Sequence, residues 1–234
     1  MAYTELFKLY INNSNEKEAC ICALEKYFPK GKFKNLLDIG CGTGALLKPL
    51  FGRFERIVGI DKKNRLDVMS ENFDFFEIDF LDFKTDEKFD FVMANYLLWE
   101  IPFQKWNEVF NKVNDLLKPN GQFVVIDAYS KIKYDNPFFP FNIGLTKKTE
   151  YINWYTFLKS QGVKYKSYSF ISKVWAENAE EMYTILKFFF MGVDEKKIYK
   201  KNRKKILNNI NNKKNHKRLD INMTHMINFI SFDR

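Results

Sequence analysis

The most constraining feature of this sequence is an apolar run that leads into three closely spaced glycines. Residues 36–39 have the composition of a buried parallel strand, and Gly40, Gly42 and Gly44 follow at alternate positions. Alternating glycines allow the backbone to pass close to a ligand before a helix begins. A second apolar run ends in Asp61, where a doubly wound sheet places an acid beside ribose hydroxyls. The pattern predicts a nucleotide-type cofactor pocket.

The charge beside the glycines indicates which class of cofactor the pocket binds. Residues 40–45 also satisfy the dinucleotide fingerprint, in which amides at a helix N-terminus bind a pyrophosphate. Asp38, two residues before the first glycine, would repel those phosphates. A carboxylate at this position favours a ligand with positive charge, such as an ammonium and a sulfonium.

The segment 36–44 resembles motif I of the class I S-adenosylmethionine-dependent methyltransferases, and the resemblance extends over residues 33–127. In that family the acid after the second strand binds the ribose, and an acidic residue followed by an apolar one contacts the adenine. Segments 89–95 and 116–127 are similar to the fourth-strand motif and to the helix, turn and strand that follow it. The resemblance implies S-adenosylmethionine as cofactor and S-adenosylhomocysteine as product. It places the cofactor at Asp38, Gly40, Cys41, Gly42, Gly44, Asp61, Lys62, Asp79, Phe80 and Asn95.

Each of these residues also has a structural interpretation. Asp38 would then cap backbone amides and Asp61 would end a strand. Cys41 lies between two glycines, where a small residue that fills a crowded loop is a better explanation than a reactive thiol. The joint spacing of the motifs favours the cofactor interpretation.

The order of apolar segments predicts an α/β fold. Strands are expected near 35–39, 56–60, 73–78, 89–94, 123–127, 165–171 and 225–232, and helices near 15–28, 150–160, 179–191 and 196–210. Pro49 predicts a short or kinked helix after the glycines. The family resemblance adds a Rossmann-like doubly wound sheet, mostly parallel, with an antiparallel pair at the C-terminal edge and helices on both faces.

We expect one domain over residues 1–234. Residues 1–34 would form an N-terminal helical cap and 35–127 the cofactor-binding core. Residues 128–234 would contain an aromatic loop, late helices and edge strands.

The formal net charge of +9 is unevenly distributed. Eleven Lys and Arg residues and no acid lie in 196–218, so the remainder of the chain is slightly acidic. A solvated surface helix is the simplest interpretation. The alternative is a surface that attracts an anionic partner, such as a phosphorylated substrate, an acidic carrier protein or nucleic acid.

Three cysteines without metal-ligand spacing predict no metal site and favour a reduced, cytoplasmic setting. The chain shows neither a secretory leader pattern at its start nor an apolar run of membrane-spanning length. The sequence does not indicate an oligomeric state.

Methyl transfer is an in-line displacement, so the enzyme mainly positions the acceptor against the methyl group. The segments after the fourth and fifth predicted strands should form the acceptor pocket. A hydroxyl acceptor needs a base, whereas a neutral amine does not. Candidate bases are Glu100, Asp127 and Tyr129, and candidate pocket residues are Tyr10, Tyr96, Trp99, Phe138 and Phe139. Glu100 is equally typical of a helix start, and the aromatic residues are equally typical of a core.

The family often has histidine after the fourth strand, where this chain has Leu98, Trp99 and Glu100. The leading hypothesis is a methyltransferase that acts on an oxygen or nitrogen of a small molecule. Two alternatives stay open. One is a methyltransferase whose RNA or carrier-bound acyl substrate docks on 196–218, and the other is a regulatory protein that binds the cofactor without catalysis.

Overall fold

The structure is a computed structural model that describes residues 3–127, 154–189, 200–211 and 219–232. The larger elements are α1 (Tyr3–Asn12), α2 (Glu16–Tyr27), β1 (Phe33–Ile39), β2 (Phe54–Asp61), β3 (Phe73–Glu77), β4 (Phe89–Asn95), α3 (Trp106–Leu116), β5 (Leu117–Asp127), α4 (Trp154–Ser160), β6 (Lys164–Ala176), α5 (Ala179–Leu186), α7 (Arg203–Asn211) and β7 (Leu219–Ser231). The 3₁₀ helices are η1 (Ala45–Arg53), η2 (Leu98–Glu100), η3 (Phe103–Lys105) and η4 (Lys187–Phe189).

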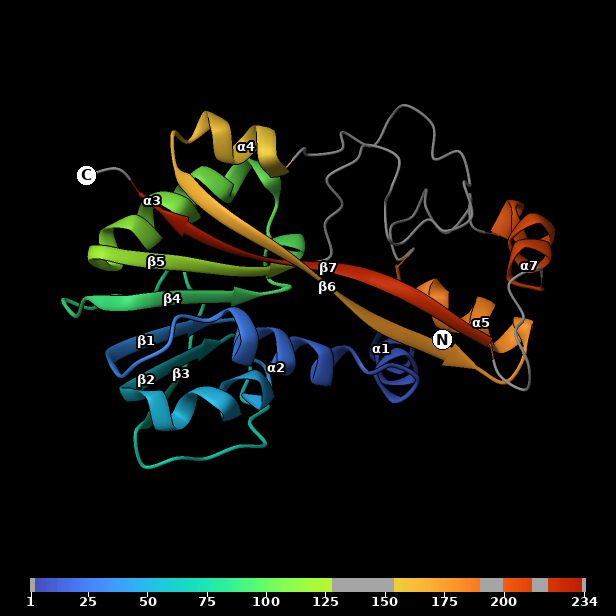
Figure 1. Ribbon diagram of the computed structural model, residues 1–234, viewed down its shortest axis with the longest axis horizontal. Helices are drawn as coiled ribbons and strands as arrows, with labels where there is room; N and C mark the ends of the chain where they lie inside the picture. Colours follow the sequence, from blue (N-terminus) through green and yellow to red (C-terminus); the bar gives the residue numbers. More distant parts are fainter. Residues whose placement is uncertain (1–2, 128–153, 190–199, 212–218, 233–234) are drawn as a thin grey trace. The chain divides into compact units, whose positions relative to one another are not determined.

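The strands form a seven-stranded sheet in the order β3-β2-β1-β4-β5-β7-β6 (Figure 1). Strands β3, β2, β1, β4 and β5 pair in parallel, and β7 pairs antiparallel with β5. This arrangement confirms the predicted Rossmann-like sheet with an antiparallel strand at its C-terminal edge. Because the parallel strands run in one direction, their carboxyl ends lie along one edge of the sheet.

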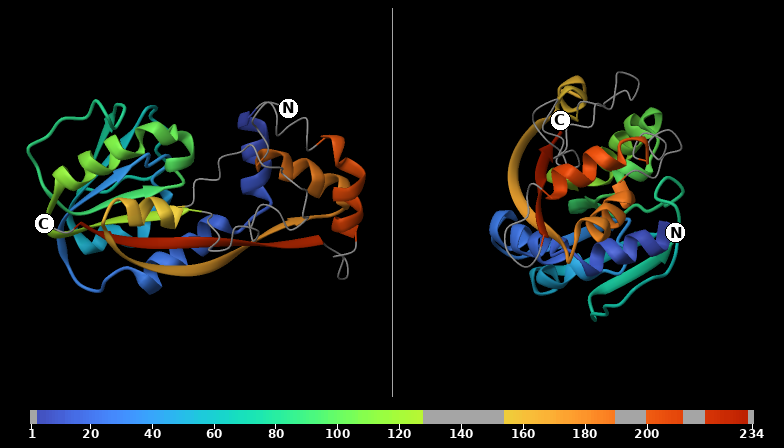
Figure 2. Two further views of the ribbon diagram at one scale, coloured as in Figure 1. Left: turned by 90° about the horizontal axis from the view of Figure 1, so that it is seen from above. Right: turned by 90° about the vertical axis from the view of Figure 1, so that its right-hand side faces the viewer.

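Helices cover both faces of this sheet, as predicted. Residues Phe123 and Val124 are neighbours on β5 and therefore point to opposite faces. Val124 belongs to the hydrophobic cluster that includes buried residues of α2 and η1, whereas Phe123 packs edge-on against Phe110 of α3. Phe110 also packs against Phe157 of α4. One face therefore carries α2 and η1, and the other carries α3 and α4 (Figure 2).

The segment after the glycines is a 3₁₀ helix, η1, with Pro49 inside it. Proline has no backbone N–H and its ring clashes with the preceding turn, so an α-helix is unfavourable here. This confirms the prediction of a short or kinked helix. Its buried residues Leu47 and Leu50 still hold it against the sheet.

Three strands are longer than predicted by five residues or more. Strand β5 begins at Leu117, which pairs with Phe89 of β4, and the pairing resumes at Gln122 after an irregularity. Asn120 has a φ of +65°, and a Cβ at Gly121 would lie 3.0 Å from the carbonyl oxygens of Lys118 and Phe89. Strand β6 continues past the predicted 165–171 to Ala176, and β7 begins at Leu219 rather than near 225. In both added segments buried residues alternate with more exposed ones, as in a strand with one buried face.

The chain divides into two compact units. Among the described residues, the larger unit contains 20–127, 154–170 and 226–232, and the smaller unit contains the rest. The expectation of one domain stays a prediction. In the described part of the chain, no helix is both long enough and apolar enough to cross a membrane.

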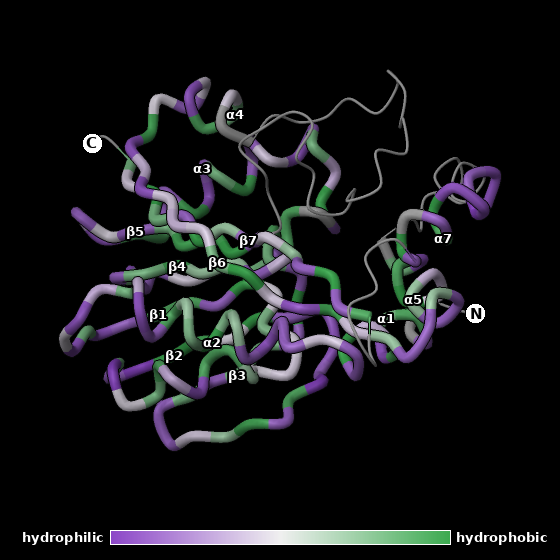
Figure 3. The backbone as a smooth tube through the Cα atoms, turned by 45° about the vertical axis from the view of Figure 1, so that its right-hand side comes forward, coloured by the Kyte–Doolittle hydropathy of each residue, from purple (hydrophilic) through white to green (hydrophobic). Residues whose placement is uncertain are grey.

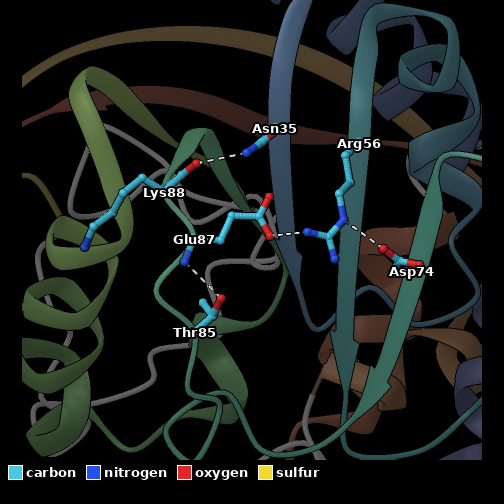
Figure 4. A network of polar contacts seen from close by, with 6 residues as sticks. All are labelled: Asn35, Arg56, Asp74, Thr85, Glu87 and Lys88. Carbon is cyan, nitrogen blue, oxygen red and sulfur yellow. Dashed lines mark hydrogen bonds and ion pairs between the residues drawn. The ribbon is translucent and has the colours of Figure 1, made fainter.

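A network of polar contacts joins the amino-terminal ends of β1 and β2 to neighbouring segments of the larger unit (Figure 4). Arg56 donates to Asp74 Oδ2 over 2.8 Å and pairs with Glu87. The Glu87 backbone donates to the Thr85 hydroxyl, and Asn35 donates to the Lys88 carbonyl. Arg56 therefore lies at the opposite end of β2 from Asp61.

The smaller unit has its own hydrophobic core. Tyr10 of α1 stacks on Phe188 with ring centroids 5.3 Å apart. Ile206 and Ile210 of α7 are buried in the same cluster as Met182 of α5. Helices α5 and α7 lie side by side (Figure 2).

The β6 and β7 strands bury a polar pair in the smaller unit. The Ser172 hydroxyl and His225 Nε2 lie 2.7 Å apart, and both side chains are inaccessible to solvent. Burial lowers the pKa of His225 to about 4, because the charged imidazolium is disfavoured away from water. His225 is therefore neutral in the folded protein at physiological pH.

The buried Ser172–His225 pair makes the stability of the folded protein depend on pH. The folded pKa of about 4 lies below the unfolded value of 6.5, so the unfolded chain binds the proton first and stability falls as pH decreases between these values. Protonation of His225 in the unfolded chain should lower the free energy of unfolding by about 2 kcal/mol when the pH falls from 7.5 to 5. Urea unfolding of the wild type and His225→Gln at both pH values measures this difference. Equal losses in the two proteins would contradict it.

Candidate functional site

The glycine loop after β1 has a left-handed backbone at three positions, with φ of +71° at Gly40, +57° at Gly42 and +73° at Gly44. A Cβ at Gly40 would lie 2.8 Å from Leu97, and one at Gly44 would lie 2.3 Å from Val68. A Cβ at Gly42 would meet no described atom within 4 Å. Packing therefore requires two of the glycines, and the middle one faces open space.

The end of β1 carries a buried carboxylate, that of Asp38, which is 1% exposed. Burial raises the pKa of Asp38 well above its usual range, and the nearby charge of Asp61 raises it further. From the end of β4, Asn95 Nδ2 donates to Asp38 Oδ1 over 3.3 Å. Asn95 Oδ1 is buried and accepts no hydrogen bond from any residue that the structure describes. Two acceptors that lack enough donors suit a ligand with an ammonium group.

Asp61, at the end of β2, is 7% exposed and lies against the glycine loop. Its Oδ2 atom accepts a hydrogen bond from the Gly42 backbone over 2.9 Å, and its Oδ1 atom accepts one from the Lys63 backbone over 3.1 Å. The Arg65 guanidinium donates to both oxygens, over 3.1 and 3.2 Å. The structure thus brings Asp61 and Gly42 together, as the sequence predicts, and adds Arg65. Asp61 ends a strand and Arg65 lies in the irregular segment after it, so no helical spacing rule points to this pair.

Asp79, after β3, is partly exposed and pairs with Lys62 over 2.8 Å. The hydrogen bond from Lys62 lowers the pKa of Asp79, and one from the Leu81 backbone adds to the effect. Phe80 is buried, and the Lys112 ammonium lies 5.1 Å from the centre of its ring. Lys62 and Asp79 therefore contact each other across the ends of β2 and β3.

Cys41 lies in the loop as a neutral thiol. Burial raises its pKa, and the charges of Asp38 and Asp61 raise it further. A Cβ at Gly59 would lie 3.0 Å from Cys41 Sγ, so the thiol fills space over β2. This arrangement supports the interpretation of a small filling residue rather than a reactive thiol.

The candidate catalytic and pocket residues fall in different places. Asp127 is fully buried at the end of β5, and Glu100 is exposed in η2. Tyr96 follows β4 with a φ of +53°, and its hydroxyl lies 3.4 Å from Cys20 Sγ. Tyr10 lies in the core of the smaller unit, where its hydroxyl donates to Glu16. Tyr129, Phe138, Phe139 and the side chain of Trp99 lie outside the described residues.

Sequence reasoning missed Glu16. Burial raises its pKa to about 7, although the hydrogen bond from Tyr10 acts in the opposite direction. The side chain is part of the smaller unit, and no sequence signal distinguishes it from other acids at a helix start.

The predicted basic helix is described only as α7 with the residues just before it. Its apolar residues Ile206 and Ile210 are buried, and Lys204 and Lys205 are exposed. Arg203 pairs with Glu180 of α5. In Figure 3 most of α7 has the colour of hydrophilic residues. This supports the interpretation of a solvated surface helix. Within the described ranges, no group of three His, Cys, Asp or Glu side chains is placed to hold a metal ion.

The loop geometry predicts different costs for two alanine substitutions. Gly42→Ala should lower the free energy of unfolding by about 1 kcal/mol, because φ at this position is positive but the space around it is open. Gly44→Ala should cost about 2 to 4 kcal/mol, because it adds a clash with Val68 to the same backbone strain. Urea unfolding of both variants measures the difference. A larger loss for Gly42→Ala would contradict this geometry.

Two curated proteins are similar to part of this chain. An uncharacterised methyltransferase of Schizosaccharomyces pombe is 35% identical over 117 residues, which cover 43% of this chain and 40% of that protein. A Geobacillus protein named as a methyltransferase is 27% identical over 128 residues, which cover 49% of this chain and 50% of that protein. The chain therefore matches about half the length, or less, of these curated relatives.

Two solved structures are similar in fold. The YcgJ protein of Bacillus subtilis superposes with a TM-score of 0.59 at 14% identity, covering 93% of this chain and 99% of that one. A Bacillus halodurans protein described as a methyltransferase gives a TM-score of 0.62 at 11% identity. The match covers 91% of this chain and 98% of that one.

A family model described as a methyltransferase domain matches residues 13–178. The match includes the glycine loop, the strand ends with Asp38, Asp61 and Asn95, and Asp79. It spans more than half of the sequence, and the sheet order agrees with it. The chain belongs to the methyltransferase domain family, and its fold is that of the class I members that use S-adenosylmethionine.

Proposed function

We propose that this chain transfers a methyl group from S-adenosylmethionine to an oxygen or nitrogen of a small-molecule acceptor. The observation that carries the cofactor site is the pair of buried acceptors, Asp38 and Asn95 Oδ1, beside the open face of Gly42. An unpaired buried carboxylate is costly, and a ligand cation removes that cost. Bound S-adenosylmethionine supplies an electrophilic methyl group on a sulfonium sulfur.

Each residue around the loop has a role in this proposal. Asp38 and Asn95 accept hydrogen bonds from the ammonium of the cofactor. Asp61 accepts from the ribose hydroxyls, and Asp79 accepts from the adenine amine while Phe80 packs against the ring. Gly42 leaves room for the ligand because it has no side chain.

The acceptor chemistry depends on whether a proton must leave. Asp127 is buried at the end of β5, one register position beyond the pairing of Asn95 with Ile126. A carboxylate at this end of the sheet supports Asp127 as a candidate base for a hydroxyl acceptor. Glu100 and Tyr129 remain candidates for the same role.

The burial of Ile206 and Ile210 favours a small-molecule acceptor over a docked macromolecule. Ile206 and Ile210 form the apolar face of α7, which packs inside the smaller unit, whereas Lys204 and Lys205 are exposed to solvent. Such a helix needs no anionic partner to account for its charge pattern.

The cofactor site is tested by calorimetry with S-adenosylhomocysteine. Asp61→Ala should weaken binding about tenfold to a hundredfold, because two hydrogen bonds to a charged group are lost. Asp74→Ala is the matched control, since Asp74 is an exposed acid on β3 that pairs with Arg56. No heat with the wild type, or equal affinity in Asp61→Ala, would refute the proposal.

Burial of Asp38 also predicts that binding is coupled to a proton. The pKa of Asp38 is raised in the free protein, and a bound ammonium lowers it, so binding releases a proton when the pH lies between the two values. Affinity should therefore fall as pH decreases through this window, by up to about tenfold per pH unit.

Calorimetry in two buffers of different ionisation enthalpy counts the protons released. Asp38→Asn keeps the shape of the side chain and should show no release from this group and a flatter pH dependence. Identical proton release in the two proteins would show that Asp38 does not face the ligand charge.

A further inference from the structure

Both oxygens of the Asp61 carboxylate already accept hydrogen bonds. A carboxylate offers about four lone-pair directions. The Gly42 backbone donates to Oδ2 and the Lys63 backbone donates to Oδ1. One nitrogen of Arg65, Nη2, lies 3.1 and 3.2 Å from the two oxygens and therefore faces both of them. A ribose with two hydroxyl donors has to share these oxygens with Arg65 while the ion pair persists.

The two kinds of hydrogen bond differ in how easily they are exchanged. The Gly42 and Lys63 donors belong to the backbone of the loop and of the chain just after β2, so they move only if the loop moves. The Arg65 side chain is 58% exposed and reaches Asp61 from four residues away. It leaves into water by side-chain rotation alone, and water solvates the released guanidinium.

We propose that Arg65 competes with the ribose of the cofactor for Asp61, so that binding of a nucleoside with a free vicinal diol displaces this ion pair. The inference rests on the proposed function and extends it, because it assigns a cofactor-affinity role to a residue outside the family motifs. Arg65 orients Asp61 in the free protein, and the diol takes the place of the guanidinium on the two carboxylate oxygens.

Asp79 shows why the limitation is specific to Asp61. Its oxygens accept one hydrogen bond from the Leu81 backbone and one from Lys62. Two lone-pair directions remain, so an adenine amine can bind without displacing Lys62. Arg65 is therefore the cation that the nucleoside must displace.

The effect on affinity should be modest and favourable. A partly exposed ion pair contributes little to stability, so its removal should tighten S-adenosylhomocysteine binding about threefold to tenfold. A residue that only supported the loop would weaken binding when replaced. The sign of the change separates competition from a structural role.

The test compares Arg65→Gln with Arg56→Gln by calorimetry with S-adenosylhomocysteine. Arg56 is the matched control, because it also lies in an ion pair with acids of the larger unit but at the opposite end of β2 (Figure 4). Arg65→Gln should bind more tightly than the wild type, and Arg56→Gln should not. The advantage should shrink as NaCl is raised from about 0.05 M to about 1 M, because salt screens the exposed pair.

A double-mutant cycle places the effect on Asp61. In an Asp61→Asn background the Arg65→Gln change should alter affinity by less than about twofold, because the ion pair is already lost. Unchanged or weaker binding in Arg65→Gln, while Asp61→Ala still weakens binding, overturns this inference and leaves the proposed function intact. If neither the wild type nor Arg65→Gln binds the ligand, the proposed function itself fails.

Discussion

The structure of the cofactor site depends on the cost of burying a carboxylate without a cation. Asp38 lies at the end of the central strand β1, with almost no exposure to water, and one hydrogen bond from Asn95 is its described polar contact. In this environment the charged form is unfavourable in the free protein and favourable beside a positive ligand. Under the proposed function, this carboxylate favours a cofactor with a positive charge.

Each of the other two acids of the site forms an ion pair with a cationic side chain of the protein. Asp61 pairs with Arg65, and Asp79 pairs with Lys62, both at the ends of strands beside β1. The hydrogen bond from Lys62 also lowers the pKa of Asp79. The site thus combines one carboxylate that lacks a cationic partner with two carboxylates that have one. This combination suits a ligand that carries its positive charge at one end and neutral hydrogen-bond donors at the other.

The sequence predicted the parts of this site that depend on local spacing. Three glycines after an apolar run, and acids at the ends of three such runs, placed Asp38, Asp61 and Asp79 correctly at strand ends. Arg65 was missed because it lies in an irregular segment after β2, where no periodic pattern predicts which side chain reaches Asp61. The full lengths of β6 and β7 were not predicted, although buried residues alternate with more exposed ones over 172–176 and 219–224.

By itself, the sequence determined the order of the strands and the positions of the glycines and acids near the strand ends, because these follow from hydrophobic period and backbone freedom. Only the tertiary structure decided which glycine faces open space, which oxygens of Asp61 are already occupied, and that Tyr10 packs in the smaller unit. Such facts depend on contacts between residues far apart in the chain or on side-chain directions, and no local pattern encodes them.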